Sequence, residues 1–146
     1  MHSSIVAMPT SYVDLHEAAF SGDIRTLEKL IGANGMCPNK PDHAGRTSLH
    51  HACMNGWLEC VKYLIDNGAS VIATDVSGCT PLHCAASNGY VETVKCLINK
   101  GNASVSVRSK KGHTPRYMAK SRYQTKVVAF FNEIENKMGG TPWLQN

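Results

Sequence analysis

Apolar residues recur along this chain at helical spacing, in short runs that end near glycine. The segments VKYLI at 61–65 and VKCLI at 94–98 each place apolar side chains on one face of a helix. Shorter segments of similar character, LHHAC at 49–53 and LHCAA at 82–86, come just before them. The pattern predicts two pairs of short helices.

These two pairs are copies of one another, displaced by 33 residues. The segment GRTSLHHACMNGWLECVKYLIDNG, from Gly45, aligns with GCTPLHCAASNGYVETVKCLINKG, from Gly78. With a shift of 34, the same frame finds LHEAAFSGDIRTLEKLI from Leu15 and GHTPRYMAKSRYQTKVVAFF from Gly112. The sequence therefore predicts four units, of which the outer two are less regular.

Each unit carries the signals that begin and end two antiparallel helices. Thr47 and Thr80 are suited to cap the first helix, and Pro81 occupies the first helical position, where its missing N–H does no harm. The dipeptide Asn-Gly then favours the end of that helix, and Gly68 and Gly101 are expected to end the second. Between units, DHAG and DVSG predict tight turns.

This arrangement resembles the ankyrin repeat, which has a period of 33 and the signature T-P-L-H-x-A. The third unit reproduces the signature in full, and the second has serine in place of proline; the matching residues are Thr80, Pro81, Leu82, His83 and Ala85, and Thr47, Leu49, His50 and Ala52. The resemblance implies an all-α solenoid of stacked helix-turn-helix units with β-turn or hairpin connections. We expect units at 14–41, 42–74, 75–108 and 109–137, a lead-in at 1–13 and a tail at 138–146.

The fourth unit departs from the signature at three positions. Arg116 stands in place of leucine, Tyr117 in place of histidine and Tyr123 in place of glycine. Such departures suit a unit that caps the stack. In the tail, Trp143 and Leu144 either fold back on the last helix or form a short linear motif.

Composition indicates a single soluble domain, with 146 residues, six cysteines and a formal net charge of +4. No segment approaches the roughly 20 apolar residues of a membrane span, and the start MHSSIVAMPTSYVD lacks the blocks of a signal peptide. We therefore expect a cytoplasmic or nuclear protein, monomeric on its own. Its cysteines should be reduced, because disulfides rarely persist in those compartments.

Cys79, His83 and Cys84 raise the alternative of a metal or thiol site. A structural zinc site needs four ligands that converge on the metal. The histidines recur in register along the repeats whereas the cysteines do not, which argues against a shared set of metal ligands. The resemblance implies that His50 and His83 are structural, each held by the threonine three residues earlier and by backbone near the hairpin. Free cysteine commonly packs as a small hydrophobe, and adjacent helical residues do not face one another. We expect packing thiols, no metal and no cofactor.

Motifs of several enzyme classes are missing from the sequence, including G-x-S-x-G, H-E-x-x-H, G-x-x-x-x-G-K and G-x-G-x-x-G. An elongated stack of helical pairs also lacks the deep pocket in which catalysis usually develops. We therefore expect a non-enzymatic module that binds another protein as an adaptor, scaffold or inhibitor.

The resemblance also implies where a partner lies, namely against the hairpin tips and the exposed side of the first helices. Carried over by position, the expected contact residues are Arg46, His51, Met54, Asn55, Trp57, Cys79, Cys84, Ser87, Asn88, Tyr90, His113, Met118, Ser121 and Arg122, with Phe20 and Asp23 extending the face. Trp57 and Tyr90 share one repeat position and are of the residue types favoured as interface anchors. The alternative is that each covers the helix ends of the neighbouring unit.

Charge is distributed unevenly along the chain. Through Asn99 there are six Lys and Arg against nine Asp and Glu, whereas from Lys100 onward there are nine against two. The predicted basic patch comprises Lys100, Arg108, Lys110, Lys111, Arg116, Lys120, Arg122 and Lys126. Such a patch suits an acidic protein, phosphate or nucleic acid, although a terminal unit also needs a polar outer face. A phosphate- or nucleic-acid-binding module is thus the first alternative, although no recognition helix, RNP motif or finger accompanies the patch.

Overall fold

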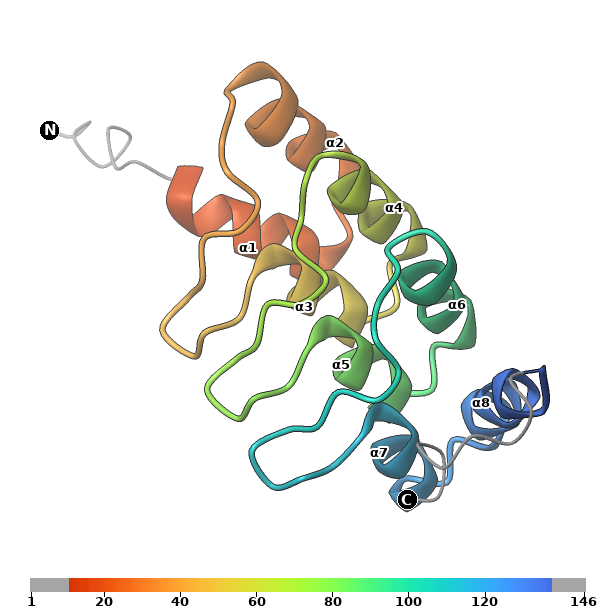
Figure 1. Cartoon of the computed structure of the whole chain (residues 1–146). Helices are drawn as coiled ribbons and strands as arrows, with labels where there is room; N and C mark the ends of the chain where they lie inside the picture. Colours follow the sequence, from red (N-terminus) through yellow and green to blue (C-terminus); the bar gives the residue numbers. More distant parts are fainter. Residues whose placement is uncertain (1–10, 138–146) are drawn as a thin grey trace, which may run out of the picture.

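The computed structural model, which describes residues 11–137, consists of antiparallel helix pairs (Figure 1). The elements in chain order are α1 (Ser11–Ser21), α2 (Ile24–Leu27), the π-helical turn η1 (Glu28–Ala33), α3 (Ser48–Met54), α4 (Leu58–Asp66), α5 (Pro81–Ser87), α6 (Val91–Asn99), α7 (Pro115–Ser121) and α8 (Thr125–Lys137). The described residues contain no strand. The predicted all-α solenoid is confirmed, whereas the predicted tail at 138–146, with Trp143 and Leu144, lies outside the described residues.

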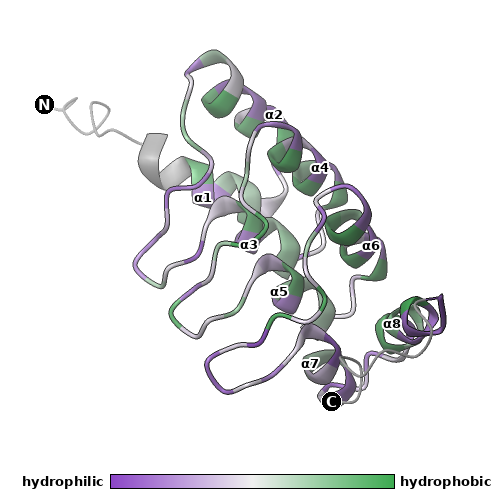
Figure 2. Cartoon of the chain, viewed as in Figure 1, coloured by the Kyte–Doolittle hydropathy of each residue, from purple (hydrophilic) through white to green (hydrophobic). Residues whose placement is uncertain are grey.

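The helices form two rows. The first helices stack as α1, α3, α5 and α7, and the second helices stack behind them as α2, α4, α6 and α8 (Figure 1). Hairpin loops project to one side of the first row, so a concave face lies between the hairpins and the first helices. Hydrophobic residues are concentrated on the helices (Figure 2). Of the helices in the described part, none is long and apolar enough to span a bilayer.

Small side chains allow the first helices to approach one another closely. One repeat position is alanine in every unit, and Ala18, Ala52, Ala85 and Ala119 are all buried. Small residues at a helix contact shorten the distance between helix axes. The first helices therefore form one side of the core, and buried apolar residues of the second helices, such as Val61 and Leu64, form the other.

The hairpins are built around aspartate, as the turn sequences predict. Gly45 N–H donates to the carbonyl oxygen of Asp42 at 2.9 Å, which closes a tight turn. The Oδ1 atom of Asp42 also accepts bonds from two backbone N–H groups farther along the turn, at 2.9 Å each. Asp75 repeats this pattern in the next hairpin, and backbone bonds of 3.0 Å join neighbouring hairpins.

The helices end at the predicted glycines. Gly56, Gly68 and Gly89 have left-handed backbone, with φ of +70°, +90° and +81°. Gly101 follows the C-cap of α6, as Gly68 follows that of α4, but the left-handed residue after α6 is Asn102, with φ of 56°. Asparagine tolerates this conformation better than most residues, and the displacement by one position matches the longer spacing of 34 to the fourth unit.

Candidate protein-binding face

His50 and His83 connect each first helix to the following hairpin. Thr47 N–H donates to Nδ1 of His50 at 3.1 Å, so the proton is on Nε2, which donates to the carbonyl oxygen of Cys79 at 2.9 Å. His83 repeats this arrangement and donates to the carbonyl oxygen of His113 at 2.8 Å. Burial lowers the pKa of both histidines. The structural role implied for them is confirmed, because both ring nitrogens are occupied.

The thiols near His83 favour the protonated form. Burial raises the pKa of Cys84 to about 12, and burial also raises the pKa of Cys79. Among the described residues, no group of three or more histidine, cysteine or acidic side chains is placed to hold a metal ion. These two cysteines are therefore suited to line a surface as small apolar groups, since a thiolate is needed for nucleophilic attack or metal binding.

A pocket of about 270 Å³ lies on the concave face between the second and fourth units. It is formed by residues of the hairpins together with residues of α3, α5 and α7. The lining residues are Arg46, Met54, Asp75, Ser77, Cys79, His83, Cys84, Ser87, Asn88, Met118 and Arg122. The fold thus brings more than half of the expected contact residues into one groove.

Charged groups in this groove differ in how far they are satisfied within the chain. Asp75 is buried, and its Oδ1 atom accepts two backbone N–H bonds at 2.9 and 3.0 Å. Its Oδ2 atom lies 3.7 Å from Nε of Arg46, whose side chain is 39% exposed. Arg122 lines the opposite end of the groove and makes no ion pair within residues 15–137. The groove therefore offers two arginines to solvent but no free carboxylate.

Trp57 and Tyr90 cover the helix ends of the preceding unit. A Cβ atom on Gly22 would lie 2.5 Å from the indole of Trp57, and the indole N–H donates to the carbonyl oxygen of Phe20 at 2.8 Å. Tyr90 lies over Gly56 in the same way. Both rings stay partly accessible, with 42% and 37% of their surfaces exposed. Covering the neighbouring unit is thus one role of these aromatics, and contact with a partner stays a prediction.

His51 lies outside the pocket, at the first hairpin. Its Nε2 is 2.9 Å from Oδ2 of Asp42, and the rings of His16 and Phe20 approach its edge at 5.6 and 6.0 Å. Burial lowers the pKa of His51. Burial opposes ionisation of Asp42, but hydrogen bonds from His51 and from backbone N–H groups prevail and lower the pKa of Asp42 to about 2.

The other expected contact residues bond within the chain. Asn55 donates from Nδ2 to the carbonyl oxygen of Phe20 at 2.7 Å, and Ser121 donates from Oγ to that of Met118 at 2.9 Å. The ring of His113 stacks on a tyrosine of α7 at 4.3 Å. These residues support the edges of the concave face.

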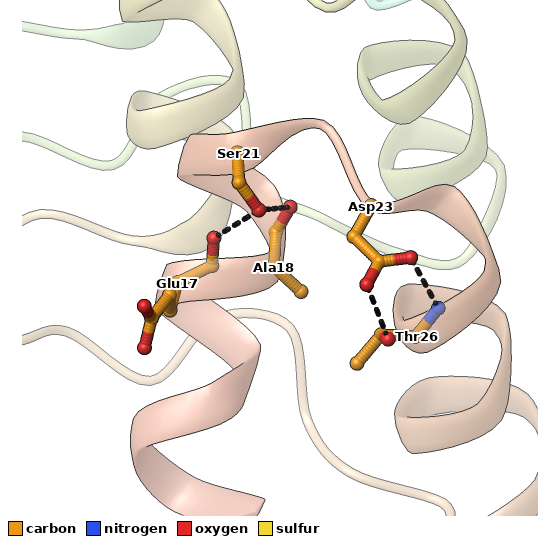
Figure 3. A pocket seen from close by; sticks show the side chains of 5 residues that line it. All are labelled: Glu17, Ala18, Ser21, Asp23 and Thr26. Atoms are coloured by element: carbon orange, nitrogen blue, oxygen red, sulfur yellow. Dashed lines mark hydrogen bonds between the residues drawn. The ribbon is translucent and has the colours of Figure 1, made fainter.

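Asp23 belongs to a separate hollow of about 300 Å³ at the turn between α1 and α2 (Figure 3). Its carboxylate accepts bonds from the backbone N–H and the hydroxyl of Thr26, at 3.1 and 2.6 Å. Ser21 donates to the carbonyl oxygen of Glu17 at 2.9 Å in the same hollow. Asp23 is therefore the N-cap of α2, and the polar groups here serve the helix ends.

The fold spreads the predicted basic patch over several surfaces. Lys100 lies beside the second helices, with Nζ 2.7 Å from Oδ1 of Asp66. Arg116 donates to Oδ1 of Asn132 at 3.2 and 3.0 Å, between α7 and α8. The other members of the patch are Arg108, which donates to a carbonyl oxygen in its own hairpin, Lys110 and Lys111 in that hairpin, Lys120 in α7, Arg122 in the groove and Lys126 in α8. Sequence reasoning could count these charges but could not assign them to faces.

Comparison with known proteins finds one family and many longer relatives. A profile described as ankyrin repeats (three copies) matches residues 15–109. Protein phosphatase 1 regulatory subunit 27 of Homo sapiens is 39% identical over 67 residues, which cover 46% of this chain and 43% of that protein. The Dictyostelium discoideum protein secG, with ankyrin repeat, PH and SEC7 domains, is 38% identical over 56 residues, or 38% of this chain and 6% of that protein. Potassium channel SKOR of Arabidopsis thaliana is 47% identical over 51 residues, or 35% and 6%. The chain therefore spans less than half the length of each.

Proposed function

Because the chain belongs to the ankyrin-repeat family, we propose that it is a non-enzymatic module that binds a protein partner through its concave groove. The observation that carries the proposal is the pocket of about 270 Å³, in which hairpin and first-helix residues of neighbouring units meet. A partner that enters this groove would contact several units at once, which is how repeat arrays gain affinity. Such binding suits an adaptor, a scaffold or an inhibitor.

Two further observations support a binding role. The thiols that line the groove are unsuited to nucleophilic catalysis, since burial raises their pKa. The human relative is named as a regulatory subunit, a role that is exerted on another protein.

Site-specific photo-crosslinking tests this proposal. A photoreactive amino acid is placed at Met118, in the groove, and at Lys62, which lies beside the second helices as a matched control. We expect crosslinks from cells to a defined protein from position 118 and not from position 62. Crosslinks only from position 62, or only to nucleic acid, would contradict the proposal.

A further inference from the structure

We infer that the groove binds an extended acidic segment of the partner, with an apolar side chain in the pocket and carboxylates on the arginine and lysine side chains at its rim. This inference rests on the proposed function and adds the chemistry of the partner. It is derived from the floor of the groove, from its rim and from the charge of the third hairpin.

Three flexible or small apolar side chains belong to the lining of the groove, and we call them its floor. Met54, Cys84 and Met118 line the pocket and are all partly exposed. Cys84 contributes as a neutral thiol, because burial raises its pKa to about 12. Methionine is flexible and polarisable, so it adapts to apolar partners of different shape. A pocket of about 270 Å³ lined in this way suits a single aliphatic or aromatic side chain.

Two polar groups next to this floor, on Asn88 and Ser87, already have partners within the chain. The amide of Asn88 donates to the carbonyl oxygens of Met54 and Cys84, at 3.1 Å each. The carbonyl oxygen of Ser87 accepts a bond of 2.9 Å from Gln124. An apolar side chain can therefore cover these two groups without stranding either of them, which would be unfavourable.

The rim presents cations toward the fourth unit. Arg122 is exposed at one end of the pocket. Lys110 is fixed against the neighbouring hairpin, because its N–H donates to the carbonyl oxygen of Ser77 at 3.0 Å. Its Cγ atom lies 3.0 Å from the place that a Cβ atom on Gly78 would take. The stem of Lys110 thus crosses beside the residues that line the pocket.

Within residues 15–137, no acidic side chain lines the end of the pocket near Arg122. The first two hairpins contain Asp42 and Asp75 at the start of the turn, whereas the third has Ser109, whose hydroxyl accepts the equivalent bond at 3.3 Å. The third hairpin is hydrophilic over most of its length (Figure 2). Among the residues that the structure describes, Asp75 alone contributes a carboxylate to the pocket, and it is buried and hydrogen bonded, so the rim favours negative charge on the partner.

A nucleic acid would satisfy only part of this site. Its phosphates match the cations of the rim, but the polar edges of its bases would be left without hydrogen-bond partners on the apolar side chains of Met54, Cys84 and Met118. In an acidic peptide, neighbouring residues can supply both the carboxylates for the rim and the apolar side chain for the floor. The apolar floor therefore favours an acidic peptide over a nucleic acid as the ligand.

Peptide selection tests the inference. A display library of random 12-residue peptides is selected for binding to the immobilised full chain. We expect the selected peptides to combine aspartate or glutamate with leucine, isoleucine, methionine or phenylalanine. Arg122→Glu should weaken their binding about tenfold or more, because it places like charges opposite one another. Lys126→Glu is the control, because it makes an equal charge change in the same unit on an exposed residue that does not line the pocket. It should change the affinity less than about twofold. Met118→Ala should also weaken binding, and circular dichroism checks that each variant is folded.

Several results would overturn the inference. Selection of neutral or basic peptides would show that the rim does not favour acidic ligands. The same conclusion would follow if acidic peptides bound the Arg122→Glu variant equally well. A single-stranded oligonucleotide that displaces the peptides at a lower concentration would identify a general polyanion site. Failure to select any peptide, together with protein crosslinks from position 118, would show a folded partner surface and leave the proposed function standing.

Discussion

Gly56 is subject to two constraints that can be separated by experiment. Its backbone is left-handed, with φ of +70°, and the ring of Tyr90 occupies the place of a Cβ atom. Gly68 is also left-handed, with φ of +90°, but nothing lies within 4 Å of such an atom. In urea denaturation we expect Gly68→Ala to lower the free energy of unfolding by about 1–2 kcal/mol, the conformational penalty alone. Gly56→Ala should lose about 1–3 kcal/mol more, because the ring must move.

The double variant provides the control. In a Tyr90→Ala background the ring is gone, so Gly56→Ala should then lower stability only by about the amount seen at Gly68. An unchanged effect of Gly56→Ala in both backgrounds would mean that Tyr90 does not pack on the second unit.

The same residues show what the sequence could and could not predict. The Asn-Gly dipeptides predicted left-handed helix ends at Gly56 and Gly89 because that preference is local to the chain. The covering of Gly56 by Tyr90 depends on how tightly the units stack, which the period alone does not specify. That Trp57 and Tyr90 cover the neighbouring unit was for this reason only an alternative to contact with a partner.

At the scale of single helices, the N-caps of α5 and α7 differ although their threonines are equally buried. Thr80 accepts from His83 N–H at 3.4 Å and contacts Nδ1 of the same imidazole at 3.0 Å. Thr114 accepts only from the N–H of Tyr117, at 3.1 Å. We expect Thr80→Ala to lower the free energy of unfolding by about 1–2 kcal/mol and Thr114→Ala by about 0.5–1 kcal/mol, measured by denaturant titration. Equal effects, or the reverse order, would show that the imidazole adds nothing to the cap.

Because His50 and His83 are buried, we expect acid to destabilise the fold. Burial lowers the pKa of His50 and His83 below 6.5, so the unfolded chain binds more protons than the folded chain just below that pH. The free energy of unfolding should therefore fall as the pH drops below about 6.5, by at most about 1.4 kcal/mol per pH unit for each histidine. Urea titrations at several pH values between 7.5 and 5.5 measure the slope. His83→Gln should reduce the slope whatever its effect on stability at pH 7.5, and a slope of the opposite sign would contradict the assignment.

The second helices were predicted less fully than the first. Periodicity identified α4 and α6, whose apolar residues fall on one face, and both are present. It did not identify the π-helical turn at Glu28–Ala33, because a single widened turn leaves the apolar pattern almost unchanged. The predicted end of α6 at Gly101 is confirmed, since the C-cap is Lys100, but the left-handed backbone at Asn102 was not foreseen.

At the scale of the whole molecule, stability should depend on how many neighbours each unit has. The helices α5 and α6 contact helices on both sides, whereas within the described residues α1 and α8 each end a row. In a stack of this kind each unit is stabilised mainly by its nearest neighbours. Amide exchange measured by mass spectrometry should therefore be slowest in α3 to α6, which all have neighbours on both sides, and faster in α1, η1 and α8.

Leu15 and Leu82 offer a matched test of this gradient, because they occupy the same repeat position and are 2% and 0% exposed. Each substitution by alanine removes the same group from a packed core and should lower stability by about 2–5 kcal/mol at most. Leu82→Ala weakens a unit on which both neighbours depend, so exchange should accelerate from α3 through α7. Leu15→Ala should accelerate exchange mainly in α1 to η1, and leave α5 to α8 close to their original rates, because the lost contacts lie at one end. If Leu15→Ala instead accelerated exchange equally in every helix, the stack would unfold as one cooperative unit, and the groove could not loosen at one end independently of the other.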